Sequence, residues 1–214
     1  MSLGIRAVGS SYPAKVRATE PPSAHFKSGR FDSPARLPTV FIVHGTRKFL
    51  DRLKEPAAAP VEVSTTALGN WYATALFWKP QVALFTNELT LVPLLVPLAP
   101  AATVIDRFPA MLETVLRAHG LGDSFVEHEL AEMTAHRVAK TENRSVVGIM
   151  NEFARLGAYD HPVNDDHDLL RLSLRLAEIP CGPLYARHVS PDRELAAFVA
   201  ARSDDDDARR TIGP

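Results

Sequence analysis

The sequence has few of the features that identify a protein class directly. Its 214 residues include one cysteine, Cys181, so no disulfide can form within the chain, and this favours a reducing compartment. The 24 Lys and Arg nearly balance the 25 Asp and Glu. The net charge of −1 therefore provides neither an overall basic field for nucleic acid nor an acidic excess.

Long hydrophobic runs are also lacking. The most apolar segment, residues 89–100, contains three prolines and is shorter than the roughly 20 residues that a membrane-spanning helix needs. No apolar segment of the secretory type follows Met1. We therefore expect a cytoplasmic protein with no membrane partner.

Signatures of catalysis and metal binding are absent as well. The chain has no G-x-S-x-G and no H-E-x-x-H, although catalytic triads are spatial and need no local motif. His128, Glu132 and His136 would align on a continuous helix, but residues 135–140 have the pattern of a strand, which breaks this alignment. The sequence thus predicts no metal and no cofactor, and it leaves open whether the protein is an enzyme.

The composition that is present, 46% hydrophobic and 23% charged, is typical of a globular chain. Residues 39–44 form a β-branched and aromatic run that suits a buried strand. Three further apolar runs, 71–78, 81–88 and 89–96, are separated by short breaks and predict an antiparallel meander. Pro93 and Pro97 place the third run at an edge of the sheet.

Helical periodicity and capping residues predict helices in the remaining segments. The expected helices begin near residues 46, 103, 123, 144, 169 and 191. The predicted fold class is α+β, with a small, mostly antiparallel sheet packed with helices and a helical C-terminal extension. The expected organisation is a poorly ordered leader at 1–38, an α+β domain at 39–157, the extension at 158–203 and a disordered tail at 204–214.

The most distinctive stretch is AKTENRSVVGIMNEFA, residues 139–154, which runs from a polar cluster into an apolar helix. With a helix start near Arg144, Gly148 and Asn151 follow Arg144 along one polar stripe. Lys140, Arg144, the Ser145 hydroxyl and the free amides of a helix N-terminus would favour a phosphate or a carboxylate. The structural alternative is that Asn143 or a neighbouring hydroxyl only caps the helix and that Arg144 pairs with a nearby carboxylate.

Three weaker signals accompany this stretch. Asn87 lies in a Thr-Asn-Glu sequence that a turn also explains. Thr46 and Lys48 follow a strand at the start of a helix, without the glycines of a phosphate-binding loop. Trp71 could stack on a base or a sugar, but an aromatic residue in a strand is more often part of the core.

Four segments together resemble a bacterial family of uncharacterised proteins, defined only as a domain of unknown function. They are HGTRKFLDRL, LGNWYATALF, ALFTNELTL and AKTENRSVVGIMNEFA, within residues 39–157. The most specific is the last, with its Lys-Thr-x-Asn-Arg-Ser-Val-x-Gly-x-Met-Asn motif at 140–151. The resemblance implies a domain boundary and a set of polar positions, and it implies no activity.

Two hypotheses follow. In the first, the protein binds an anionic ligand, a nucleotide or a nucleic-acid phosphate, at the strand-to-helix junction, with Arg144 as the principal anion clamp. The ligand-binding residues would be Lys140, Asn143, Arg144, Ser145, Asn151, Thr46, Lys48, Asn87 and Trp71. In the second, the motif is structural, and the apolar segments at 89–97 and 169–179 bind a protein partner or a second copy of the chain in an accessory or regulatory role.

Overall fold

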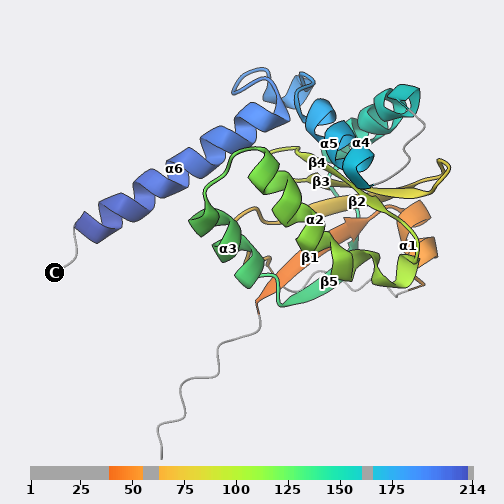
Figure 1. Cartoon of the computed structure of the whole chain (residues 1–214), viewed down its shortest axis with the longest axis horizontal. Helices are drawn as coiled ribbons and strands as arrows, with labels where there is room; N and C mark the ends of the chain where they lie inside the picture. Colours follow the sequence, from red (N-terminus) through yellow and green to blue (C-terminus); the bar gives the residue numbers. More distant parts are fainter. Residues whose placement is uncertain (1–38, 55–62, 161–165, 212–214) are drawn as a thin grey trace, which may run out of the picture. The chain divides into compact units, whose positions relative to one another are not determined.

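The structure is a computed structural model that describes residues 39–54, 63–160 and 166–211, with the backbone alone for residues 160 and 204–211. A five-stranded sheet in the order β4-β3-β2-β1-β5 forms its centre (Figure 1). Its strands are β1 (Val40–Gly45), β2 (Trp71–Leu76), β3 (Val82–Asn87), β4 (Pro93–Pro97) and β5 (Ala135–Lys140). The expected leader, residues 1–38, lies outside the described residues.

The sheet is mixed, and its two halves have different origins. β2, β3 and β4 pair antiparallel through short connections, as the meander pattern predicts, and β4 with its two prolines lies at an edge. β1, in contrast, is parallel to both β2 and β5, because longer connections that contain helices return the chain to the end of the sheet from which β1 starts. The α+β class is confirmed, and antiparallel pairing holds for the meander half.

Helices cover both faces of the sheet. They are α1 (Arg47–Leu53), α2 (Val104–Ala118), α3 (Asp123–Ala131), α4 (Arg144–Gly157), α5 (Asp166–Ala177) and α6 (Pro191–Thr211), with short 3-10 helices η1 (Ala101–Thr103), η2 (Ala158–Asp160) and η3 (Gly182–Leu184). On one face, Phe108 of α2 packs against Phe41, Trp71 and Phe85. On the other face, apolar residues of α4 and α5 pack against Tyr72, Leu84 and Leu95.

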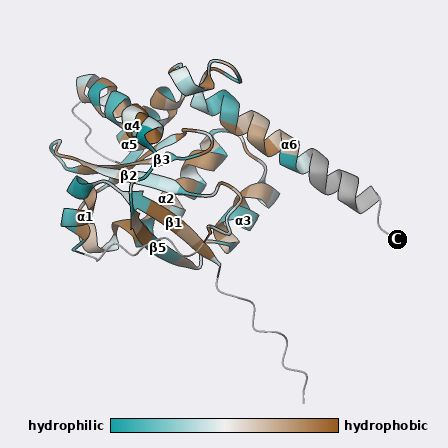
Figure 2. Cartoon of the chain, turned by 180° about the vertical axis from the view of Figure 1, so that it is seen from behind, coloured by the Kyte–Doolittle hydropathy of each residue, from teal (hydrophilic) through white to brown (hydrophobic). Residues whose placement is uncertain are grey.

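The distribution of hydrophobic residues along the strands and helices agrees with this layered packing. In Figure 2, β1 is hydrophobic along most of its length, whereas α4 carries both hydrophilic and hydrophobic residues. A strand buried on both faces and a helix with one solvent-facing side require these two patterns. No helix in the described ranges is long and apolar enough to cross a membrane.

The predicted C-terminal extension is joined closely to the sheet. Ser173 of α5 is fully buried, and its hydroxyl accepts a 2.9 Å hydrogen bond from the backbone N–H of Leu95 in the edge strand β4. α5 therefore protects an edge that would otherwise present free backbone groups. The described residues belong to one compact unit, and α6 continues as a helix to Thr211, into the segment expected to be a disordered tail.

Candidate ligand-binding site

The polar motif forms the junction between β5 and α4. β5 ends at Lys140 and α4 begins at Arg144, as the sequence pattern predicts. Asn143 is the N-cap, and its Oδ1 accepts hydrogen bonds from the backbone N–H groups of Ser145 at 3.1 Å and Val146 at 3.4 Å. The first free amides of α4 are thus satisfied within the protein.

The same asparagine belongs to a network centred on the Glu88 carboxylate. Three side chains donate to this carboxylate: Asn70 Nδ2 at 2.9 Å, the Tyr72 hydroxyl at 3.2 Å and Asn143 Nδ2 at 3.3 Å. The Tyr72 oxygen in turn accepts the backbone N–H of Asn143 at 3.1 Å. Three segments that are distant in sequence therefore meet at Glu88, which the sequence indicated only as part of a turn.

Burial and charge keep the Tyr72 hydroxyl protonated. Burial is the main cause that raises the pKa of Tyr72 to about 12, and the negative charge of Glu88 adds to it. The hydrogen bond from the Asn143 N–H acts in the opposite direction. With this pKa, the phenol serves as a stable hydrogen-bond donor and is unsuited to act as a base near neutral pH.

His44 fixes the ends of β1 and β5 beside this network. Its ring stacks on Tyr72 with 4.8 Å between the ring centroids and 15° between the planes. Its Nδ1 lies 2.8 Å from the carbonyl oxygen of Lys140 and must be the donor, because a carbonyl only accepts. His44 therefore helps to fix the position of the backbone from which the Lys140 side chain extends.

After the carboxyl ends of β1 and β5, the chain turns toward opposite faces of the sheet. Their carboxyl ends lie together because they pair in parallel up to Gly45 and Lys140. α1 follows β1 and buries Phe49 on the face covered by α2, whereas α4 follows β5 and packs on the other face. In open sheets with parallel strands, such a divergence at the carboxyl ends is the usual position of a ligand crevice.

A pocket of about 560 Å³ lies at this divergence. It is lined by Gly45, Arg47, Leu50, Asp51, Lys140 and Thr141. A Cβ added to Gly45 would lie 2.7 Å from the Leu50 side chain, so glycine allows α1 to approach the strand end closely. Two cations and one carboxylate thus surround the pocket.

The carboxylate does not neutralise this charge strongly. Arg47 Nε lies 3.9 Å from Asp51 Oδ2, and the two side chains are 94% and 69% exposed. An ion pair this long and exposed contributes little. Arg47 and Lys140 therefore remain available to an anion that enters the pocket.

The other sequence-predicted residues fall into two groups. Arg144, Ser145, Asn151 and Lys48 are exposed, and nothing lies within 4 Å of a Cβ added to Gly148, so the polar stripe of α4 faces open space. Thr46 is partly buried, and its hydroxyl donates to Thr74 Oγ1 at 2.9 Å. Of the nine predicted residues, only Lys140 is among the residues that line the pocket.

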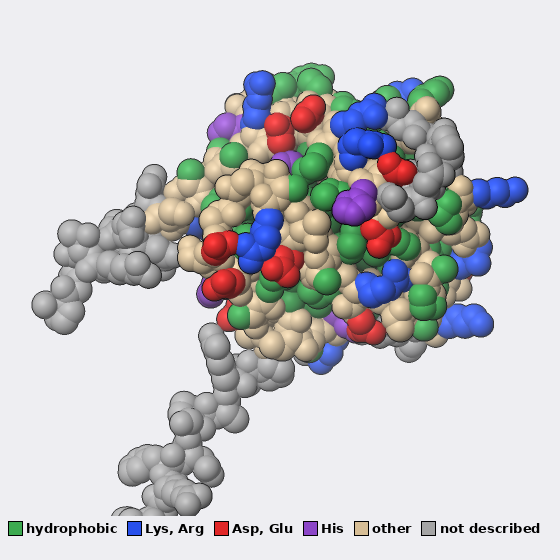
Figure 3. Space-filling view, viewed as in Figure 1, with side chains coloured by type: hydrophobic (Ala, Val, Ile, Leu, Met, Phe, Trp, Pro, Cys, Tyr) green, Lys and Arg blue, Asp and Glu red, His purple; other side chains and the backbone are tan. Residues whose placement is uncertain are grey.

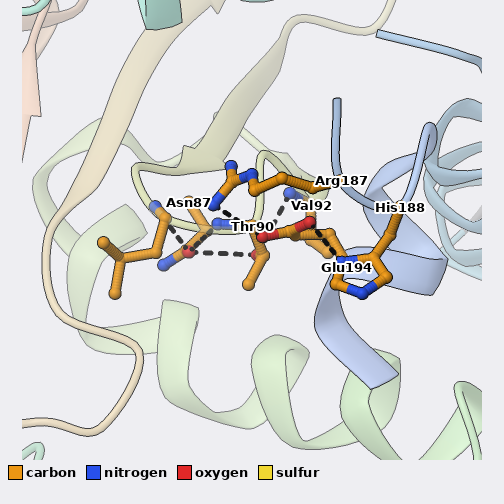
Figure 4. A network of polar contacts seen from close by, with 7 residues as sticks. Asn87, Thr90, Val92, Arg187, His188 and Glu194 are labelled. Carbon is orange, nitrogen blue, oxygen red and sulfur yellow. Dashed lines mark hydrogen bonds and ion pairs between the residues drawn. The ribbon is translucent and has the colours of Figure 1, made fainter. Parts of the chain in front are cut away.

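Asn87 and Trp71 are buried and serve the fold. Asn87 Nδ2 donates to the Leu68 carbonyl at 2.8 Å, and its Oδ1 accepts from the backbone N–H groups of Leu89 and Thr90 and from the Thr90 hydroxyl. Figure 4 shows Asn87 directed at Thr90, together with the Glu194 carboxylate directed at Arg187 and His188. Trp71 packs edge-on against Phe108 in the core.

Sequence reasoning missed the two other charged residues of the pocket, Arg47 and Asp51. Arg47 lies two positions after the last residue of β1, so the rule that ligands bind beyond the carboxyl ends of parallel strands could have identified it. Applying this rule also requires knowing that β1 and β5 pair in parallel, and that pairing depends on contacts between distant segments.

The described residues contain no group of three or more His, Cys, Asp or Glu side chains that could hold a metal ion. His128 and Glu132 do not continue onto one helix with His136, since α3 ends at Ala131 and β5 begins at Ala135. Burial raises the pKa of the Cys181 thiol to about 11, so this cysteine is a poor nucleophile.

Comparison with known proteins gives one family. The model of the domain of unknown function DUF6933 matches residues 42–194. Neither curated proteins nor solved structures give a match. The matched segment includes the pocket, the Glu88 network, α5 and the first residues of α6.

Proposed function

The chain belongs to the family of the domain of unknown function DUF6933, and we propose that it binds a phosphate-bearing ligand in the pocket between β1, β5 and α1. The observation that carries the proposal is the position of Lys140 and Arg47 at the point where the parallel strands diverge. Hydrogen bonds from ionised donors to phosphate are about twice as strong as neutral ones. The guanidinium of Arg47 can also form two parallel bonds to a phosphate.

The remaining predicted residues take different roles in this proposal. Arg144, Ser145 and Asn151 are exposed and can extend contacts from the pocket, whereas Lys48 is exposed and does not line it. Asn143 and Asn87 position the backbone, because their side-chain oxygens already accept hydrogen bonds from backbone amides. The principal clamp therefore moves from Arg144, as the sequence suggested, to Lys140 and Arg47.

The alternative of a protein-interaction module has less support. Leu94 and Leu95 of β4 and Leu169, Leu172 and Leu176 of α5 are buried in the core of the chain itself. The apolar surface that would have formed an interface is thus already used for folding. Bacterial origin, and the value of the 140–151 motif as a mark of the family, stay predictions from the resemblance.

A calorimetric titration tests the proposal. We expect inorganic phosphate, a nucleoside monophosphate or a nucleoside triphosphate to bind the wild type and to raise its melting temperature. Replacing Lys140→Met keeps the apolar stem and removes the charge, and loss of a charged hydrogen bond of about 1.5–3 kcal/mol corresponds to roughly 10- to 100-fold weaker binding. Arg47→Met should weaken binding to a similar extent.

Lys48→Met is the matched control, because Lys48 is an exposed cation on the same helix and does not line the pocket. Arg144→Ala tests the sequence-predicted clamp. Equal losses of affinity in Lys48→Met and Lys140→Met would mean that the ligand responds to positive charge in general and does not occupy the pocket. The absence of binding by all three probes would reject the proposed function.

A further inference from the structure

An exposed aromatic side chain lies beside the cations of α1. Phe77 directly follows the last residue of β2 and is 54% exposed. The Arg52 guanidinium lies over its ring, 5.1 Å from the ring centroid. Aromatic rings and guanidinium groups are both flat, and unpaired bases stack on both.

Positive charge extends along α1 from the pocket to this pair. Residues 47–54 hold four cations, Arg47, Lys48, Arg52 and Lys54, and only one carboxylate, Asp51. All four cations are exposed, as is Lys79, two residues after Phe77. Because the chain as a whole carries a net charge of −1, this basic character is local.

The two ends of α1 are close enough for one ligand to reach both. α1 has seven residues, which span about 10 Å at 1.5 Å per residue. Arg47 at its start lines the pocket, and Arg52 in its last turn contacts Phe77. In Figure 3, Lys and Arg side chains project from the right-hand edge, the side on which Figure 1 draws α1.

We propose that the surface formed by Arg47, Lys48, Arg52, Lys54, Phe77 and Lys79, here called the α1 surface, binds single-stranded nucleic acid. One phosphate occupies the pocket beside Lys140, so the inference rests on the proposed function for that contact. An unpaired base stacks on the Phe77–Arg52 pair. The remaining cations contact neighbouring phosphates of the same strand.

Other polyanions fit this surface less well. The bases of a duplex are already stacked and leave no free face for Phe77. A mononucleotide would leave Lys48, Lys54 and Lys79 without phosphates to contact. An acidic peptide would use the cations, but it has no need for an exposed ring next to them.

Fluorescence anisotropy with a labelled oligouridylate of about 12 nucleotides, within the usual range for single-strand sites, tests the inference on the full chain. We expect Phe77→Ala to bind at least about fivefold more weakly, since stacking of one base contributes on the order of 1 kcal/mol or more. Phe77→Leu keeps apolar cover and should lose the same affinity, whereas Phe77→Tyr should retain it. Affinity should fall with salt, and Lys54→Met should reduce the log–log salt slope by about 0.7.

Tyr185→Ala and Arg193→Met are the matched controls, because both residues are exposed and lie outside the α1 surface. If the wild type binds phosphate or nucleotides but not the oligonucleotide, the inference is rejected and the proposed function stands. Equal effects of Phe77→Ala and Tyr185→Ala, or equal competition by oligoglutamate, would also reject it. Failure of every phosphate-bearing probe would reject both.

Discussion

At the scale of single residues, Asn143 connects two parts of the fold with one side chain. Its Oδ1 caps α4, and its Nδ2 donates to Glu88, which follows β3. The sequence left open whether this stretch caps a helix or binds a ligand. The structure assigns the cap to Asn143 and leaves Lys140, three residues earlier, on the pocket.

This division of roles predicts a difference in stability. Asn143→Ala should lower the free energy of unfolding by about 1–2 kcal/mol, because it removes the N-cap and one donor to Glu88. Asn151→Ala changes the same residue type on the exposed side of the same helix and should stay within about 0.5 kcal/mol of the wild type. Urea denaturation measures both, and equal values for the two variants would contradict the capping role.

At the scale of elements, a buried carboxylate joins α3 to the loop before β2. Glu129 is fully buried, and its carboxylate accepts the backbone N–H of Ala67 at 2.7 Å and that of Leu68 at 3.2 Å. Burial raises the pKa of Glu129, and the two backbone hydrogen bonds oppose this effect without cancelling it. The folded state therefore holds the Glu129 proton more tightly than the unfolded chain does.

The sign of the pH dependence follows from this difference. Because the folded pKa is the higher one, the contribution of Glu129 to stability increases as the pH falls from neutrality toward 4.5, the ordinary glutamate value. The glutamine in the Glu129→Gln variant cannot titrate. The unfolding free energy of the wild type minus that of the variant should therefore increase as the pH falls from neutrality toward 4.5. Glu127→Gln removes an exposed carboxylate from the same helix and is the matched control.

Urea denaturation at several pH values measures this difference between wild type and variant. A flat difference, or one that decreases as the pH falls, would show that the backbone hydrogen bonds outweigh burial. The result would then place the folded pKa at or below its ordinary value.

At the scale of the whole molecule, α5 and α6 complete the core. Leu169, Leu172 and Leu176 of α5 pack with Leu84 and Leu95 of the sheet. Leu195 and Val199 of α6 join the core on the α2 face. The helical extension that the sequence predicts after residue 157 is present, and its helices pack on the core of the sheet.

A fragment that ends at residue 157 should therefore not fold cooperatively. Truncation of one buried leucine side chain typically costs about 2–5 kcal/mol of unfolding free energy, and a whole domain is stable by only about 5–15 kcal/mol. Because α5 contributes three buried leucines, its removal should abolish the stability of the fold. Circular dichroism should show a cooperative melting transition for residues 37–203 and none for 39–157. A cooperative transition in the shorter fragment would contradict this expectation and support a domain boundary at residue 157.

The sequence by itself determined the local elements. Periodicity and prolines located the meander and its edge strand, and the polar-to-apolar change located the start of α4, because these features depend on residues near one another in the chain. Only the tertiary structure decided that β1 and β5 are parallel neighbours, that Glu88 accepts hydrogen bonds from residues 70–72 and from Asn143, and that Arg47 and Lys140 line one pocket. These features join residues between 16 and 96 positions apart, and the packing of side chains from many elements determines such pairings.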